Sequence, residues 1–336
     1  MYQSIFSFFK KPVVRIIVSL LILILILFWL PFAELKRALQ NISLYSWILV
    51  LFGFICGHLI GVVKWRILIN MGESTLPFHT SVQCYFAGLF SNLFLPSLAG
   101  GDIVKTGLAI HHNQNKGATI FGTLLDRLID TASVVFIIIV AALYSPQFLQ
   151  SKDQYVIYTI VALFAVIFLM GIIFILMPVE KIRIEKVKNL LLHTRRIIHR
   201  TFKHPVKPAI AFMLSLGIQS AFIFLTVYLA KICGIDIPVL LWFLVWPLAK
   251  LSALLPISLG GIGVREVALV ALLNRLSVPA ANSVAVGLLW ESVLIVGGLL
   301  GGVLYWTMKN FKTQKEPSLT AISKENIQIQ DLPKYD

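Results

Sequence analysis

The sequence has few charged residues and few cysteines, and both shortages exclude whole classes of protein. Only 13% of the 336 residues are charged and 58% are hydrophobic, whereas soluble domains carry about 25% charged residues. A soluble core of this length would not use so much apolar surface, so lipid must be the solvent for most of the chain. Cys56, Cys84 and Cys233 occur singly in or beside apolar segments. Their spacing indicates neither a disulfide framework nor a cysteine metal site.

The common catalytic and metal-binding motifs are also missing. The sequence contains no H-E-x-x-H, P-loop, G-x-S-x-G or zinc-ligand spacing, so we expect no metal and no other cofactor. The net charge of +14 lies in the loops rather than on one surface that could grip DNA. We therefore expect no nucleic-acid partner, because basic loops of this kind orient membrane proteins and contact anionic lipid headgroups.

Long apolar segments predict an all-α polytopic membrane protein. The first, at about 13–30, follows basic residues and ends without a cleavage site, so we interpret it as an uncleaved membrane helix. Further segments run at about 44–63, 80–95, 118–144, 155–177, 208–232, 239–256 and 282–308, and the stretch 264–274 predicts a helix too short to span. We expect one membrane domain over 1–310 and a polar, disordered tail over 311–336.

Two motifs recur at a constant offset of 160 residues (255 − 95). The stretch 95–105 and the stretch 255–265 share a proline, a Gly-Gly pair, a valine and a final basic residue. Paired apolar segments interrupted by Pro and Gly are typical of a transporter binding site built from two repeats. The alternative is that both motifs are ordinary loops that need Pro and Gly. The offset predicts repeat halves of about 10–165 and 166–310.

The basic residues test how the segments cross the membrane. Loop 178–207 holds nine Lys and Arg against two Glu, so it should be cytoplasmic, as should both termini. If every apolar segment crossed, this loop would lie outside. If 80–95 and 239–256 instead begin re-entrant hairpins, every basic cluster lies inside and the hairpins enter from opposite faces. An extra membrane crossing within 103–117 would place the basic loop on the same side, but the polar residues of that stretch favour the hairpin. The prediction is therefore an inverted repeat with two Pro/Gly-broken re-entrant hairpins.

Several sequence elements together carry a family resemblance. They are Lys64-Trp-Arg66, the stretch 86–96 ending in Leu-Pro, Gly100-Gly-Asp-Ile-Val-Lys105, Asp126-Arg127 with Asp130, and the stretch 255–266 ending in Arg-Glu. Over roughly residues 10–308 the chain resembles the flippase-like membrane region of lysylphosphatidylglycerol synthases. In full-length relatives the resemblance implies that this region moves aminoacylated phosphatidylglycerol between leaflets, while a separate region attaches the amino acid. Only about thirty polar residues follow the last helix here, so we expect no synthase activity.

Charged residues at membrane depth are the candidates for function, because each costs roughly 2.5 kcal/mol or more to insert. Asp126 and Asp130 share a helix face, and Arg127 would pair with a carboxylate or grip a phosphate. A half-helix starting near the first Gly-Gly would present N–H groups to a phosphate. The candidate substrate-binding residues are Gly100, Gly101, Asp102, Lys105, Asp126, Arg127, Asp130, Gly260, Gly261, Arg265, Glu266 and Glu291.

Purely structural roles for the same residues stay open at this point. The Asp126 cluster would then be an ion pair that fixes helix packing, Asp102 would N-cap its half-helix, and the basic residues would snorkel to a headgroup. Lys64 and Arg66 fit an anchor at the cytoplasmic end of the second helix. Glu291, alone inside the last helix, must be paired, protonated or facing water. Its candidate partners are Arg127, Lys105 and Arg265, and a proton-coupled role is the alternative.

The leading functional hypothesis is a flippase-type transporter of a phosphate-bearing lipid, anionic or aminoacylated. It would lie in the inner (plasma) membrane of a bacterium with both termini cytoplasmic. The alternative is a membrane enzyme or accessory subunit in lipid aminoacylation or lipid-linked sugar transfer, with Asp126 and Asp130 holding a metal–phosphate donor. Two carboxylates without further ligands make a poor metal site. A third hypothesis is a scaffold for a partner lipid-modifying enzyme.

Overall fold

Every element that the structure describes is helical. In this computed structural model, the described residues are 32–40, 42–71, 75–95, 100–112, 115–145, 205–252 and 263–315. The predicted first helix at 13–30, the segment 155–177, residues 178–204 of the basic loop, both motif prolines and the Gly260-Gly261 pair lie outside them. So does the tail from residue 316 onward.

Four long helices in the described residues are apolar enough to cross a membrane. They are α4 (Leu44–Ile69), α7 (Lys116–Tyr144), α10 (Val206–Ile232) and the Ala280–Met308 part of α13 (Ala280–Lys315). Large apolar side chains such as Phe52, Leu124, Met213 and Val303 are exposed along them. Because such surfaces are stable only in an apolar medium, the composition and these helices together indicate an integral membrane protein.

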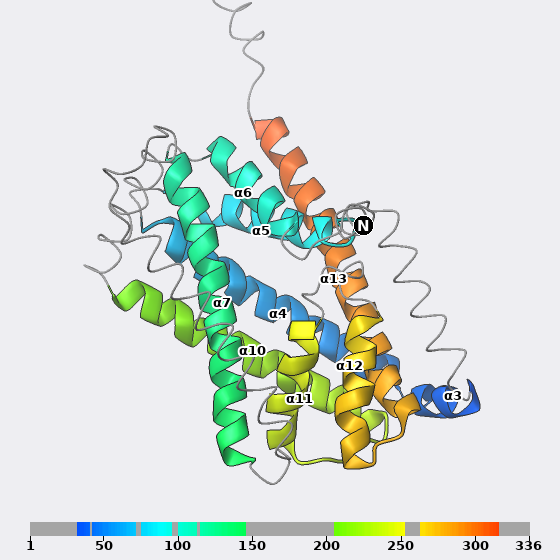
Figure 1. Cartoon of the computed structure of the whole chain (residues 1–336). Helices are drawn as coiled ribbons and strands as arrows, with labels where there is room; N and C mark the ends of the chain where they lie inside the picture. The colour runs from blue at the N-terminus through cyan, green and yellow to red at the C-terminus, as the bar shows by residue number, and fades with distance from the viewer. Residues whose placement is uncertain are drawn as a thin grey trace, which may run out of the picture.

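Shorter helices form two pairs between the long ones. Helix α5 (Phe78–Ser91) packs on α6 (Gly100–His112), and α11 (Val239–Ser252) packs on α12 (Val264–Leu273). At 1.5 Å per residue, a helix of 14 residues or fewer is too short to span a bilayer. The α5–α6 pair lies in the upper half of Figure 1, and the α11–α12 pair lies in the lower half between α7 and α13.

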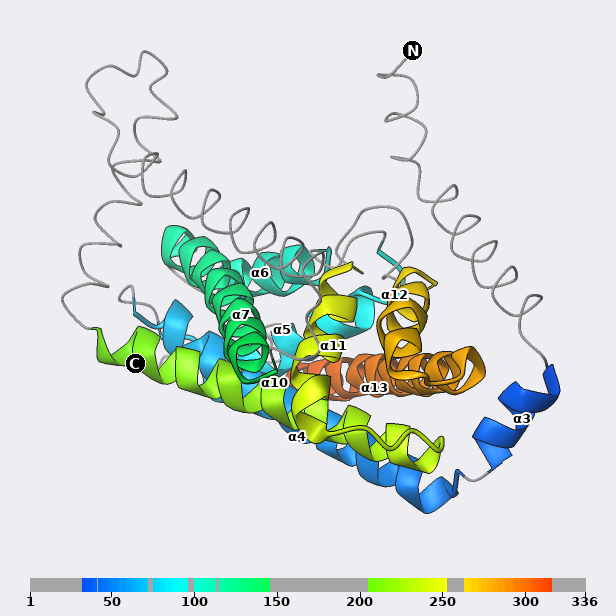
Figure 2. The same ribbon diagram turned by 60° about the horizontal axis from the view of Figure 1, so that its bottom comes forward.

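Helices α4 and α10 lie side by side and run in opposite directions (Figure 1 and Figure 2). The Tyr228 hydroxyl, near the end of α10, donates to Ser46 at the start of α4. In the middle of α4, Gly57 faces the ring of Phe222, because a Cβ at Gly57 would lie 2.4 Å from that ring. Bulky apolar side chains of one helix thus fill the glycine positions of the other.

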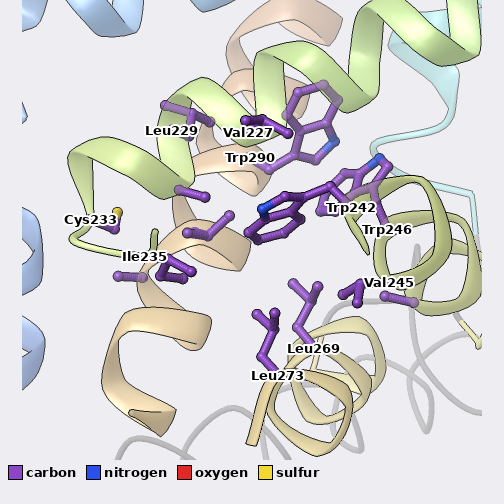
Figure 3. Packing of buried hydrophobic residues seen from close by; sticks show 14 of the residues in the cluster. Val227, Leu229, Cys233, Ile235, Trp242, Val245, Trp246, Leu269, Leu273 and Trp290 are labelled. Carbon is purple, nitrogen blue, oxygen red and sulfur yellow. The ribbon is translucent and has the colours of Figure 1, made fainter. Parts of the chain in front are cut away.

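The main core lies where α10, α11, α12 and α13 meet. Figure 3 shows Trp242 and Trp246 of α11 beside Trp290 of α13, with Leu269 and Leu273 of α12 below them. The Trp246 and Trp290 rings meet edge to face with their centroids 5.1 Å apart. These large rings fix the position of the α11–α12 pair against the long helices.

The structure corrects two predicted boundaries and adds one helix. Helix α4 continues six residues beyond the predicted end at 63, because Trp65, Leu68 and Ile69 are buried and extend its core face. Helix α13 runs to Lys315, so the first residues of the predicted disordered tail are helical. Helix α3 (Phe32–Gln40) was not predicted; its buried Leu35 and Ala38 join the core, and α3 packs on α13.

A pair of glycines permits the close contact between α5 and α6. A Cβ at Gly101 would lie 2.3 Å from the carbonyl oxygen of Gly88, and one at Gly88 would lie 2.6 Å from that of Gly101. Gly100 meets the side chain of Leu95 in the same way. The first Gly-Gly pair therefore lets two arms of a hairpin approach each other, which is a packing role.

We expect Gly101→Ala to destabilise the protein by about 1–3 kcal/mol, because the added methyl group forces two backbones apart. Gly107 in the same helix is the matched control, since a Cβ there meets nothing within 4 Å. Gly107→Ala should be neutral or stabilising, by up to about 1 kcal/mol, through helix propensity alone. Thermal unfolding in detergent micelles measures both variants. Equal unfolding temperatures for the two would contradict this account of the contact.

Candidate functional site

Six buried or half-buried charged residues form one connected network, which we call the aspartate–lysine network. Its members are Lys64 of α4, Asp102 and Lys105 of α6, and Asp126, Arg127 and Asp130 of α7. Cations and carboxylates alternate along it, so that each inner group contacts two of opposite sign. The network thereby joins α4 to the consecutive helices α6 and α7.

Lys105 and Asp126 lie at the centre of the network. The Lys105 Nζ lies 2.9 Å from Asp102 Oδ1 and 3.2 Å from Asp126 Oδ2. Its ammonium group also lies over the rings of Trp65 and Tyr85, 5.1 and 5.0 Å from their centroids. Lys105 is only 6% exposed, so it is held inside the protein by ion pairs and cation–π contacts and does not snorkel to water.

The two ends of the network are more accessible than its centre. At one end Arg127 pairs with Asp102, and the Arg127 side chain is 44% exposed. At the other end Asp130 pairs with Lys64 and accepts a hydrogen bond from Ser215 of α10 at 2.5 Å. The Asp130 side chain is 31% exposed, against 4% for Asp126. A charged ligand would therefore meet Arg127 or Asp130 first.

Lys64 belongs to this network, which corrects its predicted role as an anchor at a helix end. Its Nζ lies 3.0 Å from Asp126 Oδ1 and also contacts Asp130, and Lys64 is 2% exposed. Sequence reasoning missed this because it ended the helix at residue 63. The apolar residues that follow Lys64 were the available signal that it lies inside the helix.

The start of α6 is capped by a side chain that was not a candidate. Asn92, just after α5, accepts the N–H of Gly101 at 2.8 Å through its amide oxygen. Asp102 lies in the first turn of α6, where a carboxylate is favourable, and it uses its oxygens to pair with Lys105 and Arg127. Asp102 is therefore part of the network rather than the N-cap residue.

A second cluster, which we call the arginine–glutamate triad, links α12 to α13. Arg265 Nη2 donates to Glu266 Oε1 at 2.8 Å and to Glu291 Oε2 at 2.7 Å. Glu266 also accepts the N–H of Gly263 at 2.7 Å and so caps α12, where Gly263 takes a φ of 84° that favours glycine. Of the three candidate partners of Glu291, the structure places Arg265 beside it.

One buried polar atom of the two clusters keeps spare hydrogen-bonding capacity. Arg265 Nε has no hydrogen-bond partner among the parts of the chain that the structure describes, whereas Asp126 Oδ1 lies 3.0 Å from the Lys64 ammonium group. Native proteins satisfy almost all buried polar atoms, so each exception needs an explanation. The candidate residues Gly260 and Gly261 lie outside the described residues, and all the others take the positions given above.

These features define an integral membrane protein of helices in which charged side chains are buried within an apolar bundle. Residues 16–302 match the family described as the lysylphosphatidylglycerol synthase TM region, and the chain belongs to this family. A UPF0104 membrane protein of Pyrococcus horikoshii is 24% identical over 332 residues, covering 90% of this chain and 98% of the relative. No solved structure matches the chain.

We expect Lys64→Met to destabilise the protein by about 3–5 kcal/mol, because it leaves the buried Asp126 and the partly exposed Asp130 without their shared cation. Lys116→Met is the matched control. Lys116 is exposed at the start of α7, and its loss should change stability by about 0.5 kcal/mol or less. Unfolding in detergent micelles tests the pair. A Lys64→Met protein as stable as the control would mean that Lys64 does not hold the network together.

Removing Arg265 should be costly only while both glutamates remain charged. Arg265→Met leaves two carboxylates facing each other, and we expect a loss of about 3–5 kcal/mol. Adding Glu266→Gln and Glu291→Gln should recover a large part of that loss, because the uncompensated charges disappear. Unfolding of the single and triple variants measures the recovery. No recovery in the triple variant would show that Arg265 acts through packing alone.

Proposed function

We propose that this protein is a flippase-type transporter that moves a phosphate-bearing lipid between the two leaflets of the plasma membrane. One observation carries the proposal: two ion-pair clusters are buried inside a bundle of apolar helices, and each joins a short helix to a long one. Charges at this depth are expensive, so they are kept where a polar substrate must pass. Membership of the lysylphosphatidylglycerol synthase family supports a lipid substrate.

An inverted repeat is part of the proposal, and the helix boundaries support it. Adding 160 to the bounds of α5 (Phe78–Ser91) gives 238–251, and α11 spans Val239–Ser252. The same shift takes α4 (Leu44–Ile69) to 204–229, against Val206–Ile232 for α10. Because α4 and α10 run in opposite directions, their relation is the one that an inverted repeat requires.

The packing contacts support the repeat independently. Helix α5 packs on α13 as α11 packs on α7, and α4 packs on α7 as α10 packs on α13. The contact of α6 with α7 corresponds likewise to that of α12 with α13. In each half a basic residue of the short helix, Lys105 or Arg265, pairs with a carboxylate on the following long helix. This similarity supports placing the two clusters in corresponding parts of the proposed repeat halves.

In the proposed mechanism the two hairpins, α5–α6 and α11–α12, enter from opposite faces and alternately admit the lipid headgroup. Each inner group of the aspartate–lysine network contacts two groups of opposite sign. One ion pair can therefore break while both of its members keep a second partner. A lipid phosphate would substitute for a carboxylate on one of the cations. Both termini would lie in the cytoplasm, as the basic loops indicate.

The occupied carboxylates favour transport over the enzymatic alternative. That alternative requires Asp126 and Asp130 to hold a metal–phosphate donor. Lys64 contacts both carboxylates, and Lys105 contacts Asp126. A lysine ammonium group in this position competes directly with a divalent cation.

Lipid flipping in proteoliposomes tests the proposal. We expect the wild-type protein to move fluorescent phosphatidylglycerol or its lysyl derivative faster than phosphatidylcholine. Arg127→Ala and the Lys105→Ala/Arg265→Ala double variant should lose roughly tenfold or more of the rate, as the loss of charge-assisted hydrogen bonds predicts. Gly107→Ala is the control and should transport normally.

Folding of each variant is checked by size-exclusion chromatography and circular dichroism before reconstitution. Folded wild-type protein that moves none of these lipids would overturn the proposal. In that event, product formation by the protein together with a partner synthase or glycosyltransferase would support the accessory-subunit alternative.

A further inference from the structure

Lys250 is a half-buried cation that differs from the buried cations of the bundle. It lies in the last turn of α11, and its Nζ donates to Gln219 Oε1 of α10 at 2.8 Å. Lys64, Lys105 and Arg265 each pair with two carboxylates. Among the described residues Lys250 has no carboxylate within ion-pair distance, and its only hydrogen-bond partner is the neutral amide. Within the described residues its positive charge therefore lacks a direct carboxylate partner.

Helix α10 places this lysine beside the aspartate–lysine network. Ser215 and Gln219 are four residues apart on α10, and therefore one turn, or about 5 Å, apart on one face. Ser215 donates to Asp130, while Gln219 accepts from Lys250. Helices α7, α10 and α11 pack on one another. Lys250 and Asp130 thus contact neighbouring positions of one face of α10, and Asp130 is one of the two partly exposed ends of the network.

The network itself cannot neutralise Lys250. Its three cations and three carboxylates cancel, so its net charge is zero. An unpaired charge in apolar surroundings is unfavourable unless another charge or several hydrogen bonds compensate it. The group that fits this place is an anion carrying one negative charge.

We propose that Lys250 and Gln219 bind the phosphate of the transported lipid, and that the site selects a singly charged phosphodiester. This inference rests on the proposed function. Lys250 supplies the charge and further N–H donors. The amide nitrogen of Gln219 supplies two more donors, because its oxygen already accepts from Lys250. A phosphate monoester carries a second negative charge near neutral pH, and Asp130 lies close enough to repel it.

Lipid binding by the purified protein tests the site apart from transport. Native mass spectrometry in detergent compares phosphatidylglycerol, which is a diester, with phosphatidic acid, which is a monoester, and with uncharged diacylglycerol. We expect phosphatidylglycerol to bind most tightly. Lys250→Met should weaken its binding roughly tenfold or more, and Lys250→Arg should retain most of it. Lys231→Met, at an exposed lysine of α10, should bind as the wild type does.

Stability gives a second readout that separates this lysine from Lys64. Because Lys250 has no acidic partner among the described residues, Lys250→Met should unfold at the same temperature as the wild type or higher. A protein that binds phosphatidylglycerol normally after Lys250→Met would overturn the inference. Equal binding of diacylglycerol would also overturn it, and displacement of the lipid by inorganic phosphate would show a site for free phosphate instead.

The two proposals fail in different experiments. Wild-type protein that binds phosphatidylglycerol through Lys250 but flips no lipid would remove the transport proposal alone. If the wild-type protein flips lipid and the Lys250→Met variant flips it at the same rate, the Lys250 site alone is ruled out.

Discussion

The need to neutralise charge inside an apolar bundle governs this structure. Lys64, Lys105 and Asp126 are almost fully buried, and each would be very unfavourable alone in such surroundings. They are tolerated because cations and carboxylates alternate across α4, α6 and α7. The same requirement joins α12 to α13 through Arg265. Ion pairs, glycine contacts and aromatic packing thus place the short helices with a precision that apolar contacts in lipid would not provide.

This way of holding the short helices also suits movement. In the proposed transport cycle a hairpin must shift against the long helices without exposing a bare charge to lipid. A chain of alternating charges permits stepwise exchange of partners, whereas a single isolated pair would have to break. Arg127 and Asp130 are the partly exposed ends of that chain, where such an exchange would begin. In the proposed site Lys250, which has no carboxylate partner among the described residues, would attract an incoming anion near the Asp130 end.

Sequence patterns predicted the helices well where apolar runs are long and the flanking residues polar. The repeat motif located both pairs of short helices, and the rule that buried charges matter identified Asp126, Arg127 and Arg265. The same rule applied equally to Lys250, the single charge in its apolar segment, which was passed over. Lys64 was misplaced because charge was used to end the helix, while the packing of Trp65 and Ile69 decided where α4 ends. Helix α3 was missed because its apolar face is short.

The sequence by itself determined the helical membrane class, the family and which charged residues are unusual, because these follow from local composition, periodicity and motif spacing. Only the tertiary structure decided which charges meet. Lys105 lies 21 residues from Asp126 in the sequence (126 − 105), and Lys64 lies 62 from it (126 − 64), so no local pattern pairs them. Their partnership depends on how α4, α6 and α7 pack, and that packing depends on contacts such as Gly88 with Gly101.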